Sequence, residues 1–298
     1  MSWIPFAIVG PFFWALTNFV DKYLLGKLTC GTYDFTFFCS AAKVPALLVL
    51  LCAFGMPTFG MYALIPIISG ALVVYSYFFY GKALEKGDTS TLITLLNLTP
   101  VAVFIIAYLF LGQTMGGKEL FAFIIILMGS LVISIERING RTSLIKGFGP
   151  ALVFVLSWAV IFVMNDFGLA QMSFGSFMFW YTLGSILAGP TLLTFPIARG
   201  EILKGIRTAT AHKYSLFCGN GLIDLLAHAS INYALVLATS AALVNVVTQT
   251  QSFFSITMGV LLTIFFPHII KEDISFKTLG KKVLGAMIMF GGIYLLLV

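Results

Sequence analysis

Residues 75–112 read YSYFFYGKALEKGDTSTLITLLNLTPVAVFIIAYLFLG, two apolar runs joined by the short charged turn EKGD. Two hydrophobic helices joined by a few polar residues are typical of a membrane hairpin. A related pattern returns about 153 residues later, where residues 228–264 read HASINYALVLATSAALVNVVTQTQSFFSITMGVLLTI. At that offset Tyr80 aligns with Tyr233, and Asn97 aligns with Thr250. A duplicated hairpin with polar residues deep in apolar helices predicts a site between two related halves.

The composition extends this interpretation to the whole chain. Of the 298 residues 60% are hydrophobic and 9% are charged, and the mean hydropathy is +1.04. Soluble domains carry about 25% charged residues, so this chain cannot present a water-facing surface on all sides. Its net charge of +6 is spread over short connections, and a nucleic-acid partner is therefore not expected. The four cysteines show no metal-ligand spacing, and we expect no metal site and no cofactor.

Hydropathy predicts an all-α polytopic membrane protein with ten transmembrane helices. The spans are about 3–23, 35–54, 60–83, 90–112, 118–135, 149–168, 174–198, 214–237, 241–267 and 278–298. The longest polar connection falls near the middle, which predicts a first five-helix repeat over 1–137, a cytoplasmic linker over 138–147 and a second five-helix repeat over 148–298. An odd number of crossings reverses the direction of the next repeat, so the two repeats are expected to be inverted.

The basic residues predict the orientation. Fifteen of the Lys and Arg residues lie in the connections after odd spans or at the span ends that border them, and only Lys118 lies beside a connection after an even span. Cytoplasmic loops carry the excess of Lys and Arg. We therefore expect a protein of the cell (cytoplasmic) membrane with the odd connections in the cytoplasm and both termini on the non-cytoplasmic side.

The chain resembles the drug/metabolite transporter superfamily, specifically its ten-helix EamA-type members. The resemblance rests on the five-plus-five plan, on YGKALEKGDTSTLITLLNLTP at 80–100, and on LFLGQT and ELFAFIIILMGSLVI after it. It implies a secondary transporter of small solutes with a central cavity lined by spans 1, 3, 4, 6, 8 and 9. The chain departs from the family pattern at Gln113, where a Glu is usual just after span 4.

Polar residues recur at helical spacing inside the apolar spans. In span 8 they are four residues apart and form one stripe through the bilayer. Spans 1, 4, 6 and 9 carry similar sets, and the set of span 1 ends at Asp21. Polar groups facing lipid are costly, so we expect the stripes to face a wet cavity. The predicted substrate-binding residues are Trp14, Asn18, Tyr75, Tyr80, Asn97, Trp158, Asn165, Asn245, Thr248 and Gln249. The predicted coupling or recognition residues are Asn220, Asp224, His228, Asn232 and Lys43.

Two deep charges dominate this set. A charged Asp near the middle of a span, as at Asp224, costs about 2.5 to 3.5 kcal/mol on insertion scales. One interpretation is a proton-coupling or cation-binding carboxylate with His228 as its partner; the other is a structural hydrogen-bonded pair of these two residues. Lys43 could attract a substrate carboxylate, pair with Asp224, or extend toward the membrane surface.

These features favour a secondary carrier of an amino acid, amine or similar small organic solute, moved by alternating access, with protons as a candidate coupling ion. Its partners would be the solute and the lipid bilayer. An alternative is an intramembrane enzyme that acts on a lipid-like substrate through Asp224 and His228. No second deep carboxylate forms an evident dyad with Asp224, and no catalytic motif is present. A purely structural or receptor role is a third alternative, and the many interior polar residues argue against it.

Overall fold

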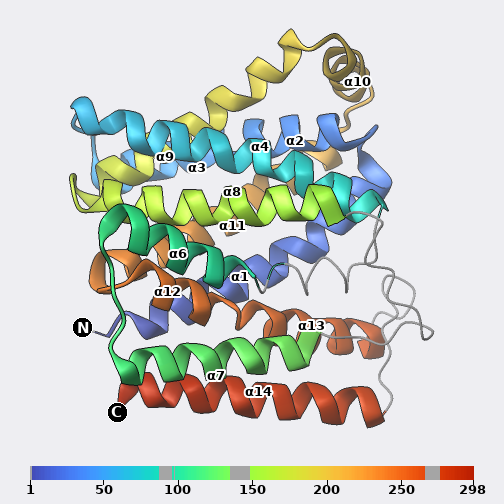
Figure 1. Ribbon diagram of the computed structural model, residues 1–298. Coiled ribbons are helices and arrows are strands. Elements are labelled where there is room, and N and C mark those ends of the chain that lie inside the picture. The colour runs from blue at the N-terminus through green and yellow to red at the C-terminus, as the bar shows by residue number, and fades with distance from the viewer. Residues whose placement is uncertain (1, 87–95, 97, 135–147, 266–275) are drawn as a thin grey trace.

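The computed structural model describes residues 2–86, 96, 98–134, 148–265 and 276–298. These residues form helices and connections without a β-strand, which confirms the all-α prediction. The long helices lie roughly side by side, and the two termini are at the same end of the bundle (Figure 1). The predicted linker 138–147 lies outside the described residues.

Each of the ten predicted spans contains at least part of a helix. In the first half these are α1 (Ile4–Tyr23) with its π-helical extension η1 (Leu24–Leu28), α2 (Thr32–Ala41), α3 (Val44–Phe54), η2 (Met61–Ala63), α4 (Leu64–Lys86), α6 (Thr99–Leu111) and α7 (Gly117–Ser134). In the second half they are α8 (Phe148–Leu169), α9 (Phe174–Thr191), η3 (Leu192–Thr194), α10 (Pro196–Arg207), α11 (Ala211–Leu237), α12 (Ala241–Thr248), α13 (Gln251–Phe265) and α14 (Phe276–Leu297).

Several of these helices are long and apolar enough to cross a membrane. Within the described ranges, four stretches meet that length and composition: Ile4–Leu28, Thr32–Phe54, Met61–Ala83 and Gly149–Leu169. A bent pair, Phe174–Thr194 with Pro196–Arg207, adds a fifth if it is counted as one span. Ten crossings therefore remain a prediction.

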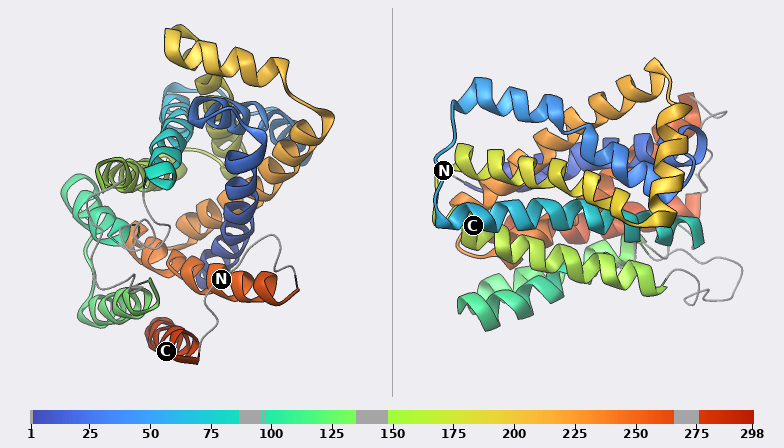
Figure 2. Two further views of the ribbon diagram at one scale, coloured as in Figure 1. Left: turned by 90° about the vertical axis from the view of Figure 1, so that its right-hand side faces the viewer. Right: turned by 90° about the horizontal axis from the view of Figure 1, so that it is seen from above.

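The seventh predicted span, 174–198, ends earlier than expected. The helix stops at Thr194, and α10 then leaves at 111° to it. Phe195 is extended, with φ −89° and ψ 121°, because the residue before a proline disfavours the α conformation. As a result, α10 runs across the end of the bundle and not along it (Figure 2).

Two other predicted spans are interrupted. Span 2 breaks at Ala42 and Lys43, between α2 and α3, because Pro45 has no N–H for the carbonyl four residues before it. Span 9 breaks at Gln249 and Thr250, whose backbone N–H groups bond three residues back. The break in span 2 places Lys43 at the junction of α2 and α3.

Helices of the two halves pack against each other throughout the bundle. The pairs α1 with α11, α4 with α8, and α4 with α9 form the centre, while α7 packs beside α14 at one edge. Small residues permit the closest contacts: a Cβ on Gly129 would lie 2.5 Å from the backbone nitrogen of Met289. The main buried core therefore draws on both halves.

Candidate functional site

A buried ion pair joins the two halves at the centre of the bundle. The Lys43 ammonium donates to Asp224 Oδ2 at 2.6 Å. Lys43 is 5% exposed and Asp224 is 8% exposed. The pair connects the α2–α3 break to the middle of α11. Of the arrangements considered for Lys43, the structure has the pairing with Asp224, and Tyr77 adds a longer hydrogen bond of 3.4 Å to the same oxygen.

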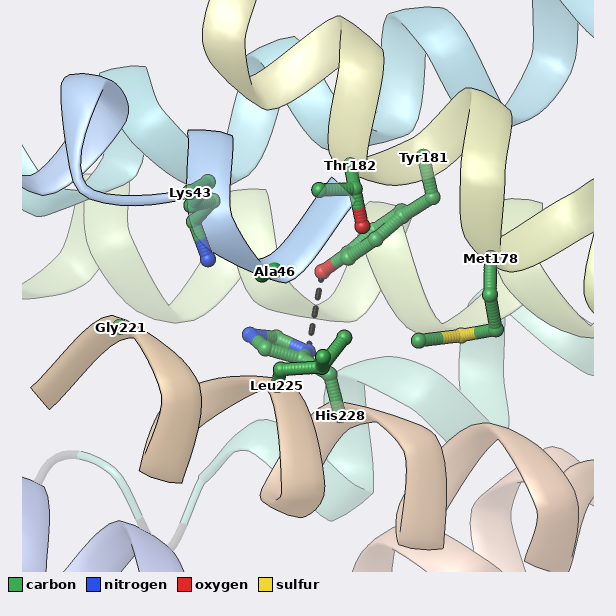
Figure 3. A pocket seen from close by; sticks show the side chains of 8 residues that line it. All are labelled: Lys43, Ala46, Met178, Tyr181, Thr182, Gly221, Leu225 and His228. Atoms are coloured by element: carbon green, nitrogen blue, oxygen red, sulfur yellow. Dashed lines mark hydrogen bonds between the residues drawn. The ribbon is translucent and has the colours of Figure 1, made fainter. Parts of the chain in front are cut away.

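His228 lies one helical turn beyond Asp224 and is enclosed by aromatic rings. Its Nε2 is 3.5 Å from Asp224 Oδ1, and a 3.0 Å hydrogen bond joins its Nδ1 to the Tyr181 hydroxyl (Figure 3). Trp158 stacks on the imidazole with 5.8 Å between ring centroids. Trp14 meets it edge-on at 5.5 Å. The prediction that both tryptophans lie on helices facing the centre is thus consistent with their contacts.

A small pocket opens beside this pair. Figure 3 shows Lys43, Tyr181 and His228 pointing toward one another from three elements. The pocket is lined by Lys43, Ala46, Met178, Tyr181, Thr182, Gly221, Leu225 and His228. Its wall combines a cation and hydroxyls with a thioether and aliphatic groups, so it offers both polar and apolar contacts.

Two buried polar atoms near the pocket have no hydrogen-bond partner among the described residues. They are the indole nitrogen of Trp158 and Nε2 of His228. Buried polar groups are normally hydrogen-bonded, and an unpaired one needs an explanation. A ligand or water that supplies the missing partners is the simplest one.

A second polar chain crosses the core further along α11. Asn165 on α8 donates to Asn232 Oδ1 at 3.0 Å and accepts from the Ser69 hydroxyl. Asn232 in turn donates to the Met178 sulfur at 3.4 Å. This chain brings two predicted residues together and ties α4 and α8 to α11.

A second carboxylate lies on the other side of Asp224. Asn220 donates to Asp21 Oδ1 at 2.7 Å, and the charges of Asp224 and Lys43 both act on Asp21. The sequence shows no evident dyad partner for Asp224, and Asp21 is a carboxylate whose charge nevertheless acts on it. Asp21 lies on α1, far from Asp224 in the chain, and the contact of α1 with α11 brings their helices together. The helical spacing of Trp14, Asn18 and Asp21 was the sequence signal that Asp21 lies on the interior face of α1.

Other predicted residues lie apart from this centre. Tyr75 shares a 2.5 Å hydrogen bond with Thr191 and packs near η3 and α10. Tyr80 packs on Phe154, and Asn18 is partly exposed. Asn97 lies outside the described residues.

The predicted residues of span 9 form a local cluster at its break. Thr248 donates to the Asn245 carbonyl at 2.6 Å, and Gln249 donates to the same carbonyl at 3.4 Å. Asn245 Oδ1 is buried without a partner among the described residues.

The side chains of the site are suited to binding a small polar solute. Within the described ranges, no three His, Cys, Asp or Glu side chains are grouped so that they could hold a metal ion. An ammonium and a carboxylate in contact, flanked by aromatic rings, can recognise both charges of a small solute.

Comparison with known families bears on the first half of the chain. The family model described as "EamA-like transporter family" matches residues 1–135. This match covers a little under half of the chain. This family is part of the drug/metabolite transporter superfamily, so the resemblance stated from the sequence is confirmed. The match over residues 1–135 and the long apolar helices indicate a polytopic membrane protein, and the matched family consists of transporters of the drug/metabolite type.

The EamA-like region supplies Trp14, Lys43 and Tyr77 to the site, and the remainder supplies the α8, α9 and α11 residues. The fold of the whole chain matches a solved structure whose title is "Crystal structure of protein", with a TM-score of 0.65 and 14% identity over 98% of this chain and 94% of that chain. That likeness concerns the fold alone. A comparison with curated proteins found no match.

Proposed function

We propose that this EamA-like transporter is a secondary carrier of a small zwitterionic or cationic organic solute, such as an amino acid or amine. The observation that carries the proposal is the Lys43–Asp224 ion pair, 2.6 Å long and buried between the two halves. Replacing such a pair by apolar residues is often neutral or stabilising. Stability alone therefore does not account for this pair in the centre of a membrane protein.

A zwitterion has the two charges that this pair can accept. Its carboxylate would take the place of Asp224 on Lys43, and its ammonium would bind the freed Asp224 carboxylate. The unpaired Trp158 indole nitrogen, which is a donor only, would serve the solute carboxylate. The rings of Trp14 and Trp158, 5.3 Å apart, would contact its apolar part.

Alternating access between the two halves is the proposed mechanism. The proposed units are 1–137 and 148–298 with the linker 138–147, and the helix contacts support an exchange symmetry. Contact of α1 with α11 corresponds to contact of α8 with α4, and contact of α6 with α8 corresponds to contact of α13 with α1. Each of these two contacts has its counterpart when spans 1–5 are exchanged with spans 6–10, as expected for repeats around a central site.

The proposed location is the cell (cytoplasmic) membrane, with the α10 end in the cytoplasm. Arg199, Lys204 and Arg207 on α10 are exposed, at the end opposite both termini (Figure 1). Basic residues favour the cytoplasmic side. Labelling of Met56→Cys by an impermeant maleimide in intact cells tests this orientation, and protection of that cysteine would reverse it.

Ligand binding by the purified protein tests the proposed solute class. A bound ligand raises the melting temperature by mass action. We expect α-amino acids to raise it more than their N-acetyl and methyl-ester derivatives, each of which lacks one charge. In Lys43→Met the advantage of the amino acid over its methyl ester should disappear, while in the control Lys118→Met it should persist.

Transport in proteoliposomes completes this test. The stabilising solute should enter loaded vesicles and be recovered chemically unchanged, as a carrier requires. Equal stabilisation by zwitterions and singly charged analogues, or conversion of the solute, would count against the proposed function.

A further inference from the structure

Asp21 and Asn220 form a pair with one unused acceptor. Asn220 on α11 is 8% exposed, and its Nδ2 donates to Asp21 Oδ1 at 2.7 Å. Its other amide atom, Oδ1, is buried and has no hydrogen-bond partner among the described residues. A buried acceptor without a donor loses its hydrogen bond to water and gains none in return. Something in the working protein is therefore expected to donate to it.

The charges around Asp21 leave it without a free counter-ion. Lys43 is the cation that acts on it, and Lys43 already contacts Asp224 at 2.6 Å. Two carboxylates thus share one ammonium in a setting where unpaired charge is expensive. The other ionisable groups that face Asp21 carry no positive charge: they are Cys39 on α2 and Tyr77 and Tyr80 on α4.

In the described part of the chain, the other helices that contact α1 add no charged side chain that could serve Asp21 as a counter-ion. The helices α12 and α13 contain no titratable residue, and Lys22 and Lys27 near the end of α1 are exposed. Asp21 itself is partly exposed and lies near the C-terminal end of α1.

We propose that Asp21 is the proton-binding residue of this carrier, distinct from the Lys43–Asp224 pair that recognises the solute. On protonation one Asp21 oxygen gains a hydrogen and donates it to Asn220 Oδ1, while the other keeps the bond from Nδ2. The carboxylic acid and the amide are then joined by two hydrogen bonds, one donated by each group. The net charge of Asp21, Lys43 and Asp224 rises from −1 to 0, and proton release restores it. This step rests on the proposed carrier function.

A second carboxylate–amide pair in the protein, Asp166 with Gln113, serves as a control because its amide oxygen already accepts a hydrogen bond. Gln113 Nε2 donates to Asp166 Oδ2 at 2.6 Å, so a carboxylate again meets a primary amide. Here the amide carbonyl is already occupied, because the Ala241 backbone N–H donates to Gln113 Oε1 at 3.0 Å. A proton on Asp166 would gain no such acceptor, which makes Asp166→Asn the control.

Infrared spectroscopy of the full-length protein in nanodiscs detects the proton directly. Over a pH series, the wild type should show a carbonyl-stretching band of a protonated carboxylic acid that Asp21→Asn abolishes and Asp166→Asn retains. If Asp21→Asn does not fold, Asn220→Ala serves instead, because it keeps the carboxyl and should shift or remove the band. A band that is unchanged in the tested Asp21 or Asn220 variant would overturn the proposal.

Transport separates this inference from the function on which it rests. In Asp21→Asn, accumulation driven by a pH gradient should fall at least tenfold, while exchange of solute without a gradient should stay within about twofold of wild type. Undiminished gradient-driven accumulation would refute the proton site and leave the carrier intact. A band lost in Asp21→Asn, in a protein that moves no solute, would retain the proton site and reject the carrier.

Discussion

At the residue scale, single and double variants of Lys43 and Asp224 distinguish a role of this ion pair in stability from a role in transport. Each charge is tolerated in the core only because the other is 2.6 Å away. Removing one partner of a buried pair costs about 3–5 kcal/mol, whereas replacing both by apolar residues is often neutral or stabilising. The two kinds of variant therefore have different expected effects on folding and the same expected effect on transport.

We predict that Asp224→Leu lowers the melting temperature strongly and abolishes transport, because it leaves the Lys43 ammonium buried without a counter-ion. The double variant Lys43→Met, Asp224→Leu should recover most of the melting temperature and remain inactive. Thermal unfolding and solute uptake measure the two effects. An active double variant would remove the pair from solute recognition.

The sequence predicted the α11 residues better than their partners. A four-residue spacing puts Asn220, Asp224 and His228 on one stripe whatever surrounds the helix, and all three lie in polar contacts at the centre. Their partners depend on which helices meet. Nothing local distinguishes Tyr77, which reaches Asp224, from Tyr75, which lies near α10.

At the element scale, the breaks in the helices account for what hydropathy could not show. Mean hydropathy predicts where a span lies and is insensitive to a two-residue interruption within it. Pro45 and Pro196 were visible signals for the break at Lys43 and the bend before α10. The break at Gln249 has no proline, and a hydrogen bond from the Thr248 hydroxyl to the Asn245 carbonyl lies directly before it. Such bonds also occur in the unbroken helices α4 and α7, so no local sequence signal explains this break.

The contact of α4 with α9 gives a prediction at this scale. A Cβ on Gly70 would overlap the Tyr181 carbonyl oxygen, and a Cβ on Gly184 would overlap the Ile67 carbonyl oxygen. Because backbone cannot move aside cheaply, Gly70→Ala should destabilise the protein by about 1–3 kcal/mol and displace Tyr181 from His228. Thermal unfolding and ligand affinity should both decrease.

Gly219→Ala on α11 is the matched control for this prediction. Nothing lies within 4 Å of its added Cβ, so the higher helix propensity of Ala should leave stability unchanged or raise it by up to about 1 kcal/mol. Equal destabilisation by both substitutions would show that the α4–α9 contact is not close.

At the scale of the whole molecule, the two halves are held together at the α10 end by a second buried ion pair. Lys213 on α11 donates to Asp34 Oδ2 on α2 at 2.8 Å, and Asp34 is fully buried. Glu201 on α10 accepts from the Asp34 backbone N–H at 3.0 Å. Alternating access requires these contacts to separate whenever this end opens, and a covalent link there should stop the cycle.

Cys30 offers such a link with one substitution. Its sulfur lies 3.9 Å from the Thr208 hydroxyl oxygen, and Cys30 precedes α2 in the first half whereas Thr208 follows α10 in the second. In Thr208→Cys, small side-chain rotations would bring the two sulfurs to the roughly 2 Å of a disulfide. Oxidation should reduce transport at least tenfold, and a reducing agent should restore it. Cys30→Ser in the same background should make transport insensitive to the oxidant. Undiminished transport by a protein whose disulfide is verified by mass spectrometry would mean that this end stays closed throughout the cycle, and the exchange between two inverted halves would have to be abandoned.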